Sequence, residues 1–288
     1  MKTRTIGDVT VSAIGFGGMP ISIEGRPDED QAIATIHAAL DAGITFIDTA
    51  DAYRMPGEGF SHNEQLIAKA LKSYGGDTSN ILVATKGGHL RDEPVKDAWQ
   101  LNGHPDYLKK AVQSSIKNLG VEAIGLYQFH RPDPSVPYAD SVGAIRDLLD
   151  DGLIRMAGIS NANPDQIRES QEILGGRLVS VQNQFSPNFR SSEPELVLCD
   201  EMGIAFLPWS PLGGITRAAG LGDRFAPFQT IARERGVSPQ VICLAWELAK
   251  SPVVIPIPGS SRPATITDSA SAVDVELTAD EVATLDAA

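Results

Sequence analysis

Ile124-Gly125-Leu126-Tyr127-Gln128-Phe129-His130 is an almost continuously apolar run that ends on a histidine. A run of this length and composition is typical of a strand that is buried on both faces, as in a parallel sheet. Seven more runs of the same kind lie along the chain, at residues 13–17, 44–48, 81–86, 154–159, 178–182, 204–209 and 253–257. The sequence therefore predicts eight parallel strands.

The stretches between these runs are predicted to be helices. Apolar residues recur at helical spacing over residues 108–119, and Gly120 follows at the position where a helix usually ends. Capping-box patterns at residues 61–64 (Ser-His-Asn-Glu) and 278–281 (Thr-Ala-Asp-Glu) predict the first turns of two more helices.

Repeated strand–helix units with no break in composition favour a closed (β/α)8 barrel, the TIM barrel, over a doubly wound open sheet. We expect residues 1–288 to form one such domain. Residues 3–11, around Gly7-Asp8, are predicted to be a short N-terminal β-hairpin at the bottom of the barrel. Long loops at 87–105 and 212–227 follow the third and seventh strands, so both are predicted to wall a pocket at the catalytic face.

The charge balance limits the kinds of partner. The 288 residues hold 24 Lys and Arg against 37 Asp and Glu, a formal net charge of −13. An acidic chain does not suit nucleic acid or an anionic membrane, although a local basic pocket can still bind a small anion. We expect a small-molecule substrate, and a monomer or weak homo-oligomer.

The sequence also predicts a cytoplasmic protein without a metal site. The two cysteines, Cys199 and Cys243, have no metal-ligand or redox spacing and are expected to be buried and reduced. The N-terminus lacks the apolar segment of a signal peptide, and no uncharged apolar run approaches the roughly 18 residues of a membrane span.

Polar residues end three of the predicted strands. Asp48, Lys86 and His130 each close an apolar run, and Tyr53 lies in the loop after Asp48. In a barrel these strand ends meet at one mouth. A phenol has a pKa of about 10, so Tyr53 becomes a useful acid only if a neighbour such as the Lys86 ammonium stabilises the phenolate. Asp48 would keep Lys86 charged, and His130 could bind a substrate oxygen.

These residues also carry a resemblance to a known family. The stretch Phe46-Ile47-Asp48-Thr49-Ala50-Asp51-Ala52-Tyr53 resembles the F-x-D-T-A-x-x-Y signature of the aldo-keto reductases. Ala84-Thr85-Lys86 and residues 126–133 (Leu-Tyr-Gln-Phe-His-Arg-Pro-Asp) are similar to the lysine and histidine motifs of the same family. The resemblance implies a catalytic tetrad of Asp48, Tyr53, Lys86 and His130 that reduces aldehydes and ketones, with Tyr53 as general acid.

The resemblance further implies a nicotinamide cofactor that transfers hydride and is bound without a G-x-G-x-x-G motif. Its implied contacts are Gly18, Met19, Asp48, Ser160, Asn161, Gln182, Trp209, Ser210, Pro211, Leu212, Gly213, Gly259, Ser260, Ser261, Arg262 and Asp268. The segment from Gly259 to Arg262 also has a physical rationale, because hydroxyls, a glycine and an arginine at a helix N-terminus suit a phosphate.

The identity of the cofactor depends mainly on Arg262. We expect NADPH/NADP+, with Arg262 on the 2′-phosphate, and weaker use of NADH. The sequence departs from the family at two places: Thr265 stands where many members have a second arginine, and Asp268-Ser269 stands where they have Glu-Asn near the adenine. The missing arginine removes one charge-assisted contact and is expected to weaken the preference for NADPH.

The substrate pocket is predicted from the same loops. Met19, Tyr53, Trp99 and Phe185 are expected to line it, and His89 is expected at the surface. The chain ends directly after its last helix, whereas many members of the family continue with a loop that closes over the substrate. On that basis we expect an open pocket and broad specificity.

Two alternatives remain open at this point. A Schiff-base aldolase would use Lys86 as its nucleophile, but it would not need Tyr53, Trp209 or the Arg262 loop. A non-catalytic NADPH-binding subunit, similar to the ion-channel accessory subunits of this fold, would need a docking surface, and no long exposed apolar stretch is evident.

Overall fold

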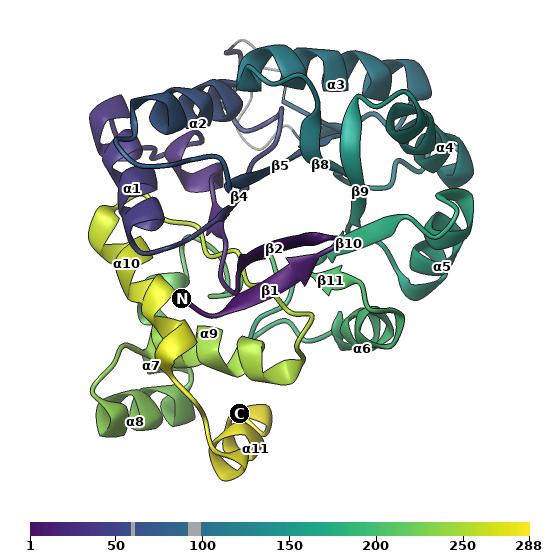
Figure 1. Ribbon diagram of the computed structural model, residues 1–288. Helices are drawn as coiled ribbons and strands as arrows, with labels where there is room; N and C mark the ends of the chain where they lie inside the picture. Colours follow the sequence, from purple (N-terminus) through teal and green to yellow (C-terminus); the bar gives the residue numbers. More distant parts are fainter. Residues whose placement is uncertain (59–60, 92–98) are drawn as a thin grey trace.

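The computed structural model describes residues 1–58, 61–91 and 99–288. Its main feature is a curled parallel sheet enclosed by helices (Figure 1). The strands, in their order across the sheet, are β11 (Ala205–Phe206), β10 (Leu178–Gln182), β9 (Ile154–Ser160), β8 (Ile124–Phe129), β5 (Leu82–Gly87), β4 (Phe46–Asp48) and β3 (Phe16–Gly17). Each matches one of the predicted apolar runs.

The eighth strand position is filled by residues 253–259, which close the barrel between β11 and β3. Val254 bridges Phe206 in parallel, and Gly259 bridges Gly17 in the same sense. The segment forms no regular strand, because Pro256 and Pro258 have no N–H to donate to a ladder. The prediction of a (β/α)8 barrel is confirmed, with its last strand held by single bridges.

Helices cover the outside of the sheet. They are α1 (Glu29–Asp41), α2 (His62–Ser73), α3 (Pro105–Leu119), α4 (Tyr138–Asp150), α5 (Pro164–Ile173), α6 (Glu193–Met202), α7 (Leu221–Arg224), α8 (Ala226–Arg235), α9 (Pro239–Lys250), α10 (Pro263–Ala270) and α11 (Ala279–Asp286), with 3-10 turns at Met19–Ile21, Ala218–Gly220 and Ser271–Asp274. None of the helices in the described part of the chain has the length and apolarity needed to cross a membrane.

Two of the three predicted helix ends are confirmed. Gly120 ends α3 in the left-handed conformation, with φ of 68°. Thr278 and Glu281 form both hydrogen bonds of a capping box at α11. At α2 the predicted capping box is wrong: Ser61 has φ of 69° and does not cap through its side chain. Glu64 is buried instead and accepts a hydrogen bond from Thr85 Oγ1 at 2.5 Å.

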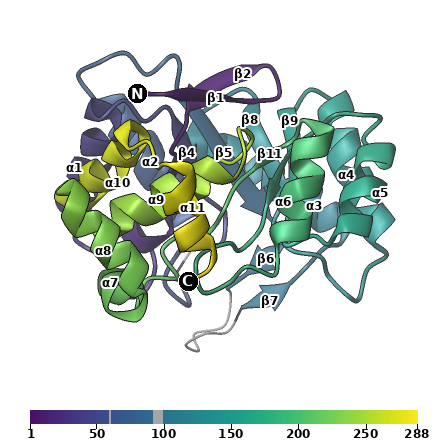
Figure 2. The same ribbon diagram turned by 90° about the horizontal axis from the view of Figure 1, so that it is seen from below.

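The N-terminal hairpin closes one end of the barrel, as predicted. β1 (Thr3–Ile6) and β2 (Val9–Ser12) pair antiparallel, and Gly7 turns the chain with φ of 58°. The side chains of Ile6 and Val11 are fully buried against residues inside the barrel. Figure 2 shows the hairpin at one end and the short pair β6 (His89–Leu90) and β7 (Gln100–Leu101) at the other. The hairpin leaves only the second end of the barrel open.

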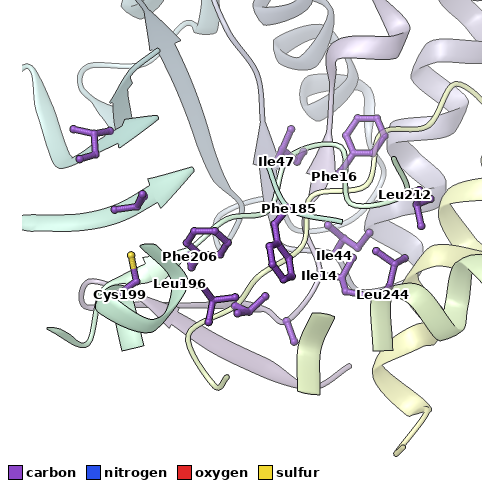
Figure 3. Packing of buried hydrophobic residues seen from close by; sticks show 14 of the residues in the cluster. Ile14, Phe16, Ile44, Ile47, Phe185, Leu196, Cys199, Phe206, Leu212 and Leu244 are labelled. Atoms are coloured by element: carbon purple, nitrogen blue, oxygen red, sulfur yellow. The ribbon is translucent and has the colours of Figure 1, made fainter. Parts of the chain in front are cut away.

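The main apolar core lies between the sheet and the helices. Figure 3 shows side chains of strands, such as Ile47 and Phe206, packed against helix residues such as Leu196 and Leu244. Both cysteines, Cys199 and Cys243, are buried in this core and are not in disulfides. This packing holds the strands in place, so that the residues at their ends have fixed positions.

Candidate active site

A cavity of about 650 Å³ opens at the carboxyl ends of the strands. Its lining is Gly17, Met19, Pro20, Ile23, Glu24, Asp48, Tyr53, His89, Arg91, Trp99, Leu101, His130, Arg131, Ser160, Asn161, Gln182, Trp209, Ser210, Pro211, Leu212, Gly214, Ile215, Ala218, Ile257, Pro258 and Gly259. This volume is in the range of small-molecule sites. Most of the residues predicted for a site therefore lie around one space.

Lys86 joins the predicted catalytic residues. Its Nζ donates hydrogen bonds to Asp48 Oδ2 at 2.6 Å, to the backbone oxygen of Thr49 at 2.9 Å and to the Tyr53 hydroxyl at 3.3 Å. The side chains of Lys86 and Asp48 are 0% and 3% exposed, so water does not screen this ion pair. The ammonium is therefore held against the phenol.

The other oxygen of Asp48 receives two side-chain amides. Gln182 Nε2 donates to Asp48 Oδ1 at 2.8 Å, and Gln128 Nε2 donates to the same atom at 3.3 Å. Sequence reasoning singled out Gln182 and missed Gln128. Gln128 carries the same signal, a buried amide inside an apolar strand, where an unpaired amide is costly.

The pKa values of Tyr53 and Lys86 follow from burial and from each other. Burial raises the pKa of Tyr53 above its usual value, and the opposing charge of Lys86 only partly offsets this. For Lys86 burial alone would lower the pKa, but Asp48 and Tyr53 together raise it. Lys86 is therefore held in its protonated form, and its charge lowers the pKa of Tyr53 by less than burial raises it.

His130 faces Tyr53 from the end of β8. The two rings meet edge to face with centroids 5.8 Å apart. Burial, together with the charge of Lys86, lowers the pKa of His130 well below its usual value. The imidazole is therefore neutral at pH 7 and can hydrogen-bond to a neutral carbonyl oxygen.

His89 lines the cavity and is not a surface residue. Its ring packs edge to face on His130 and at a tilt on Trp99, with 4.8 Å between centroids in both pairs. Burial lowers its pKa to about 4. The expectation for His89 failed because the short pair β6–β7 folds this part of the loop over the cavity. Residues 92–98 of the same loop lie outside the described residues.

The predicted cofactor residues on β9 and β10 form a second polar wall. Ser160 Oγ donates to the backbone oxygen of Gln182 at 2.7 Å, which links the ends of the two strands. Asn161, with φ of 57°, donates to the backbone oxygen of His130 at 3.0 Å. Its Oδ1 accepts from Trp209 Nε1 at 3.2 Å. The wall thus connects Trp209 with His130, one of the predicted catalytic residues.

The predicted phosphate loop continues from the cavity to α10. Gly259 lines the cavity, and the next three residues lead to Pro263, the first residue of the helix. Ser260 Oγ accepts from Arg262 N at 3.2 Å and donates to Arg262 O at 2.9 Å, which orders the turn. Arg262 itself is exposed.

Some residues predicted for the site do not line the cavity. Phe185 is fully buried in the core, where it stacks on Trp246 with centroids 5.5 Å apart, because it points to the helix side of the sheet (Figure 3). Asp268 accepts from Ser238 Oγ at 2.7 Å on the surface of α10. The rest lie beside or behind the lining: Gly18, Gly213, Ser260, Ser261 and Arg262.

Charged residues that sequence reasoning missed also border the cavity. Arg91 forms an ion pair with Glu24 and lies over the Trp99 ring at 4.6 Å. Arg131, the residue after His130, donates to Asn161 Oδ1 at 3.2 Å. Among the described residues, no group of three His, Cys, Asp or Glu side chains could hold a metal.

Comparison with known proteins agrees with this arrangement. The sequence profile of the Aldo/keto reductase family matches residues 13–288. The chain belongs to the aldo/keto reductase family. An uncharacterized oxidoreductase of Schizosaccharomyces pombe is 36% identical over 99% of this chain and 89% of its own length. A second protein of that yeast, named aldo-keto reductase yakc [NADP(+)], is 31% identical over 96% of this chain and 88% of its own.

A solved aldo/keto reductase structure shares the fold. The glycerol dehydrogenase of Gluconobacter oxydans superposes with a TM-score of 0.83 at 26% identity, over 99% of this chain and 94% of the other. Family membership and fold together support an oxidoreductase that binds a nicotinamide cofactor.

Proposed function

We propose that this aldo/keto reductase is an NADP(H)-dependent carbonyl reductase in which Tyr53 is the general acid. The observation that carries the proposal is the position of Lys86, buried between the Asp48 carboxylate and the Tyr53 hydroxyl. A buried ammonium with its own counter-ion stabilises a phenolate more than it stabilises a phenol. It therefore favours proton transfer out of Tyr53.

In the proposed reaction Tyr53 gives its proton to the carbonyl oxygen of the substrate. Burial raises the pKa of Tyr53, so the hydroxyl keeps its proton until a stronger base, an oxygen gaining negative charge, comes within reach. His130 is neutral and donates a hydrogen bond that orients the same oxygen. Lys86 then faces the phenolate, and Asp48 holds Lys86 in place.

A nicotinamide cofactor fits the second half of the cavity. Ser160, Asn161 and Gln182 present amide and hydroxyl groups suited to a carboxamide, and Trp209 offers a flat face for the ring. Gly259 borders the same space and leads to the N-terminus of α10, where Arg262 and the backbone N–H groups suit a phosphate. When bound, the cofactor supplies the hydride.

The preference for NADP(H) is supported by Arg262 and by one relative. Arg262 is exposed at the helix N-terminus and can contact a 2′-phosphate. The S. pombe relative yakc carries NADP(+) in its name. NADH lacks the 2′-phosphate, so we propose that it binds more weakly.

The environment of Lys86 does not favour a Schiff-base aldolase. A lysine nucleophile needs a lowered pKa, because only the neutral amine attacks a carbonyl. Here Asp48 and Tyr53 raise the pKa of Lys86, and the ammonium donates three hydrogen bonds. The geometry therefore suits an electrostatic role for Lys86.

The test of the proposed function is the Tyr53→Phe variant in an NADPH-oxidation assay with small aldehydes. We expect kcat to fall by roughly 10²- to 10⁴-fold, the usual contribution of a positioned acid, with NADPH affinity retained. Tyr74→Phe, which removes a hydroxyl bonded to Asp41 at the surface, is the matched control. Retained turnover in Tyr53→Phe would exclude Tyr53 as the acid. Tight NADPH binding without turnover in the wild type would favour an accessory subunit.

A further inference from the structure

Among the described residues, the charged side chains that border the cavity leave one positive charge without an opposite partner. Asp48 is neutralised by Lys86 behind it, and Glu24 forms an ion pair with Arg91. The lowered pKa values of His89 and His130 leave both imidazoles neutral at pH 7. Arg131 is the remaining charged group of the described cavity lining.

Arg131 has a costly position for a cation. The side chain is half-buried, and burial lowers its pKa below the usual value for arginine. Arg131 donates a hydrogen bond to Asn161 Oδ1 at 3.2 Å. This amide oxygen is neutral, and it also accepts a hydrogen bond from Trp209 Nε1. Within the described ranges the guanidinium of Arg131 pairs with an amide oxygen and with no carboxylate, and its Nε is buried without a hydrogen-bond partner.

The position contrasts with that of two other arginines, Arg26 and Arg91. Arg26 forms a two-pronged pair with Glu58, and Arg91 pairs with Glu24. A half-buried guanidinium without a carboxylate is stabilised when an anion completes its environment. The two acidic residues of the described cavity lining, Glu24 and Asp48, are already paired with Arg91 and Lys86.

The place of Arg131 identifies which ligand can reach it. It directly follows His130, and it lines the same cavity as His130 and Tyr53. A molecule whose carbonyl lies between Tyr53 and His130 therefore has this guanidinium beside its reacting end. The planar fork of arginine matches a carboxylate in geometry as well as in charge.

We propose that Arg131 is the binding site for a carboxylate on the substrate, so that the preferred substrates are aldehydes or ketones that also carry a carboxylate. This inference rests on the proposed carbonyl reductase function. It assigns to Arg131 a role in substrate selection, separate from the proton transfer by Tyr53.

The test compares matched acidic and neutral aldehydes. The probes are 3- and 4-carboxybenzaldehyde and their methyl esters, which differ in charge and keep the same reacting group. We expect the wild type to have a kcat/KM for the acids that is roughly tenfold or more above that for the esters, the gain typical of a charged hydrogen bond. The better of the two isomers reports the distance between carboxylate and carbonyl.

Three variants separate charge from structure. Arg131→Gln removes the charge and keeps an amide donor for Asn161, so the acid-to-ester ratio of kcat/KM is expected to fall to about one, the value for no charge recognition. Arg131→Lys keeps the charge without the fork and should give an intermediate ratio. Arg155→Gln removes a charge from an exposed position of β9 and should leave the ratio unchanged.

Each result decides between stated alternatives. Equal ratios in Arg131→Gln and wild type would overturn the inference. A weaker Kd for NADPH in Arg131→Gln with the ratio unchanged would assign Arg131 to the cofactor and also overturn it. A wild type that reduces the esters but disfavours the acids would overturn the inference and keep the proposed function. A wild type that reduces none of the four aldehydes would overturn both.

Discussion

Gln182 and Lys86 approach Asp48 from opposite sides, each on its own carboxylate oxygen. The Gln182 amide donates to Oδ1 at 2.8 Å, and the Lys86 ammonium donates to Oδ2 at 2.6 Å. Asp48 thus has partners on both oxygens, with Gln128 as a third donor at 3.3 Å. Among the residues that the structure describes, the other partners of Lys86 are neutral oxygens, on Thr49 and Tyr53. Lys86 therefore depends on Asp48 for its only counter-charge among these contacts, whereas Asp48 keeps two amide donors without Lys86.

Substitutions of Asp48 and of Lys86 should therefore lower the stability of the protein by different amounts. Asp48→Leu leaves a buried ammonium without a counter-ion and should lower the free energy of unfolding by roughly 3–5 kcal/mol. Lys86→Met leaves a carboxylate that two amides still solvate, so its loss should be the smaller one. Urea denaturation measures both. Arg177→Gln, which breaks an exposed pair with Asp150, is the control and should change stability by less than about 1 kcal/mol. Equal losses in both buried variants would contradict this account.

Barrel closure depends on glycine at position 17. A Cβ on Gly17 would lie 2.7 Å from the backbone oxygen of Ile257, in the segment that completes the barrel. Because backbone cannot move aside as a side chain can, Gly17→Ala should cost about 1–3 kcal/mol of stability. Gly143, inside α4, has open space around the same position, so Gly143→Ala should stabilise by about 0.5–1 kcal/mol. Thermal or urea denaturation of the two alanine variants checks the opposite signs.

The strands could be predicted from the sequence because each is buried on both faces. A run such as residues 124–129 is then almost entirely apolar, with Gln128 as the exception, and this pattern can be recognised without knowing which strands lie beside it. The last strand shows the limit of the rule: its apolar pattern is present, but alternating prolines prevent a regular ladder. The apolar pattern correctly predicted the position of this segment in the barrel. The backbone hydrogen bonds of a regular strand are missing because proline has no N–H group.

The position of a candidate-site residue could be predicted from the sequence where its residue type at a buried strand end needs a specific partner. Lys86 at a strand end, buried beside Asp48, is such a case. Residues whose direction depends on tertiary contacts were not predictable. Phe185 turned out to face the helices, and His89 turned out to face the cavity, although both lie near strand ends. In an irregular loop the spacing of residues along the sequence does not indicate in which direction a side chain points.

The neutral imidazole of His89 predicts a loss of stability in acid. Its pKa is about 4 in the folded protein, against about 6.5 when unfolded, so the unfolded chain binds a proton first as the pH falls. The stability tied to His89 is complete above pH 6.5 and decreases between about 6.5 and 4. At pH 5 the decrease should be about 2 kcal/mol relative to pH 7, from 1.4 kcal/mol per pH unit.

His89→Phe isolates this contribution from that of other titrating groups. Phenylalanine keeps a ring between Trp99 and His130 but cannot take up a proton. Urea denaturation at pH 7 and pH 5 should show a smaller pH-dependent loss in the variant than in the wild type. The same loss in both proteins would mean that His89 does not hold its neutral form in the fold.

Discrimination between NADPH and NADH should depend on Arg262. The side chain is exposed at the N-terminus of α10, where the helix dipole also favours an anion. Arg262→Ala should weaken NADPH binding by roughly tenfold or more, the loss of one charged hydrogen bond, while NADH binding changes little. The measurement is the Kd of each reduced cofactor from its own fluorescence, with Arg155→Ala as a charge-matched control on the exposed side of β9. Equal weakening of both cofactors would show that Arg262 supports the pyrophosphate or the loop, since only a contact with the 2′-phosphate separates NADPH from NADH.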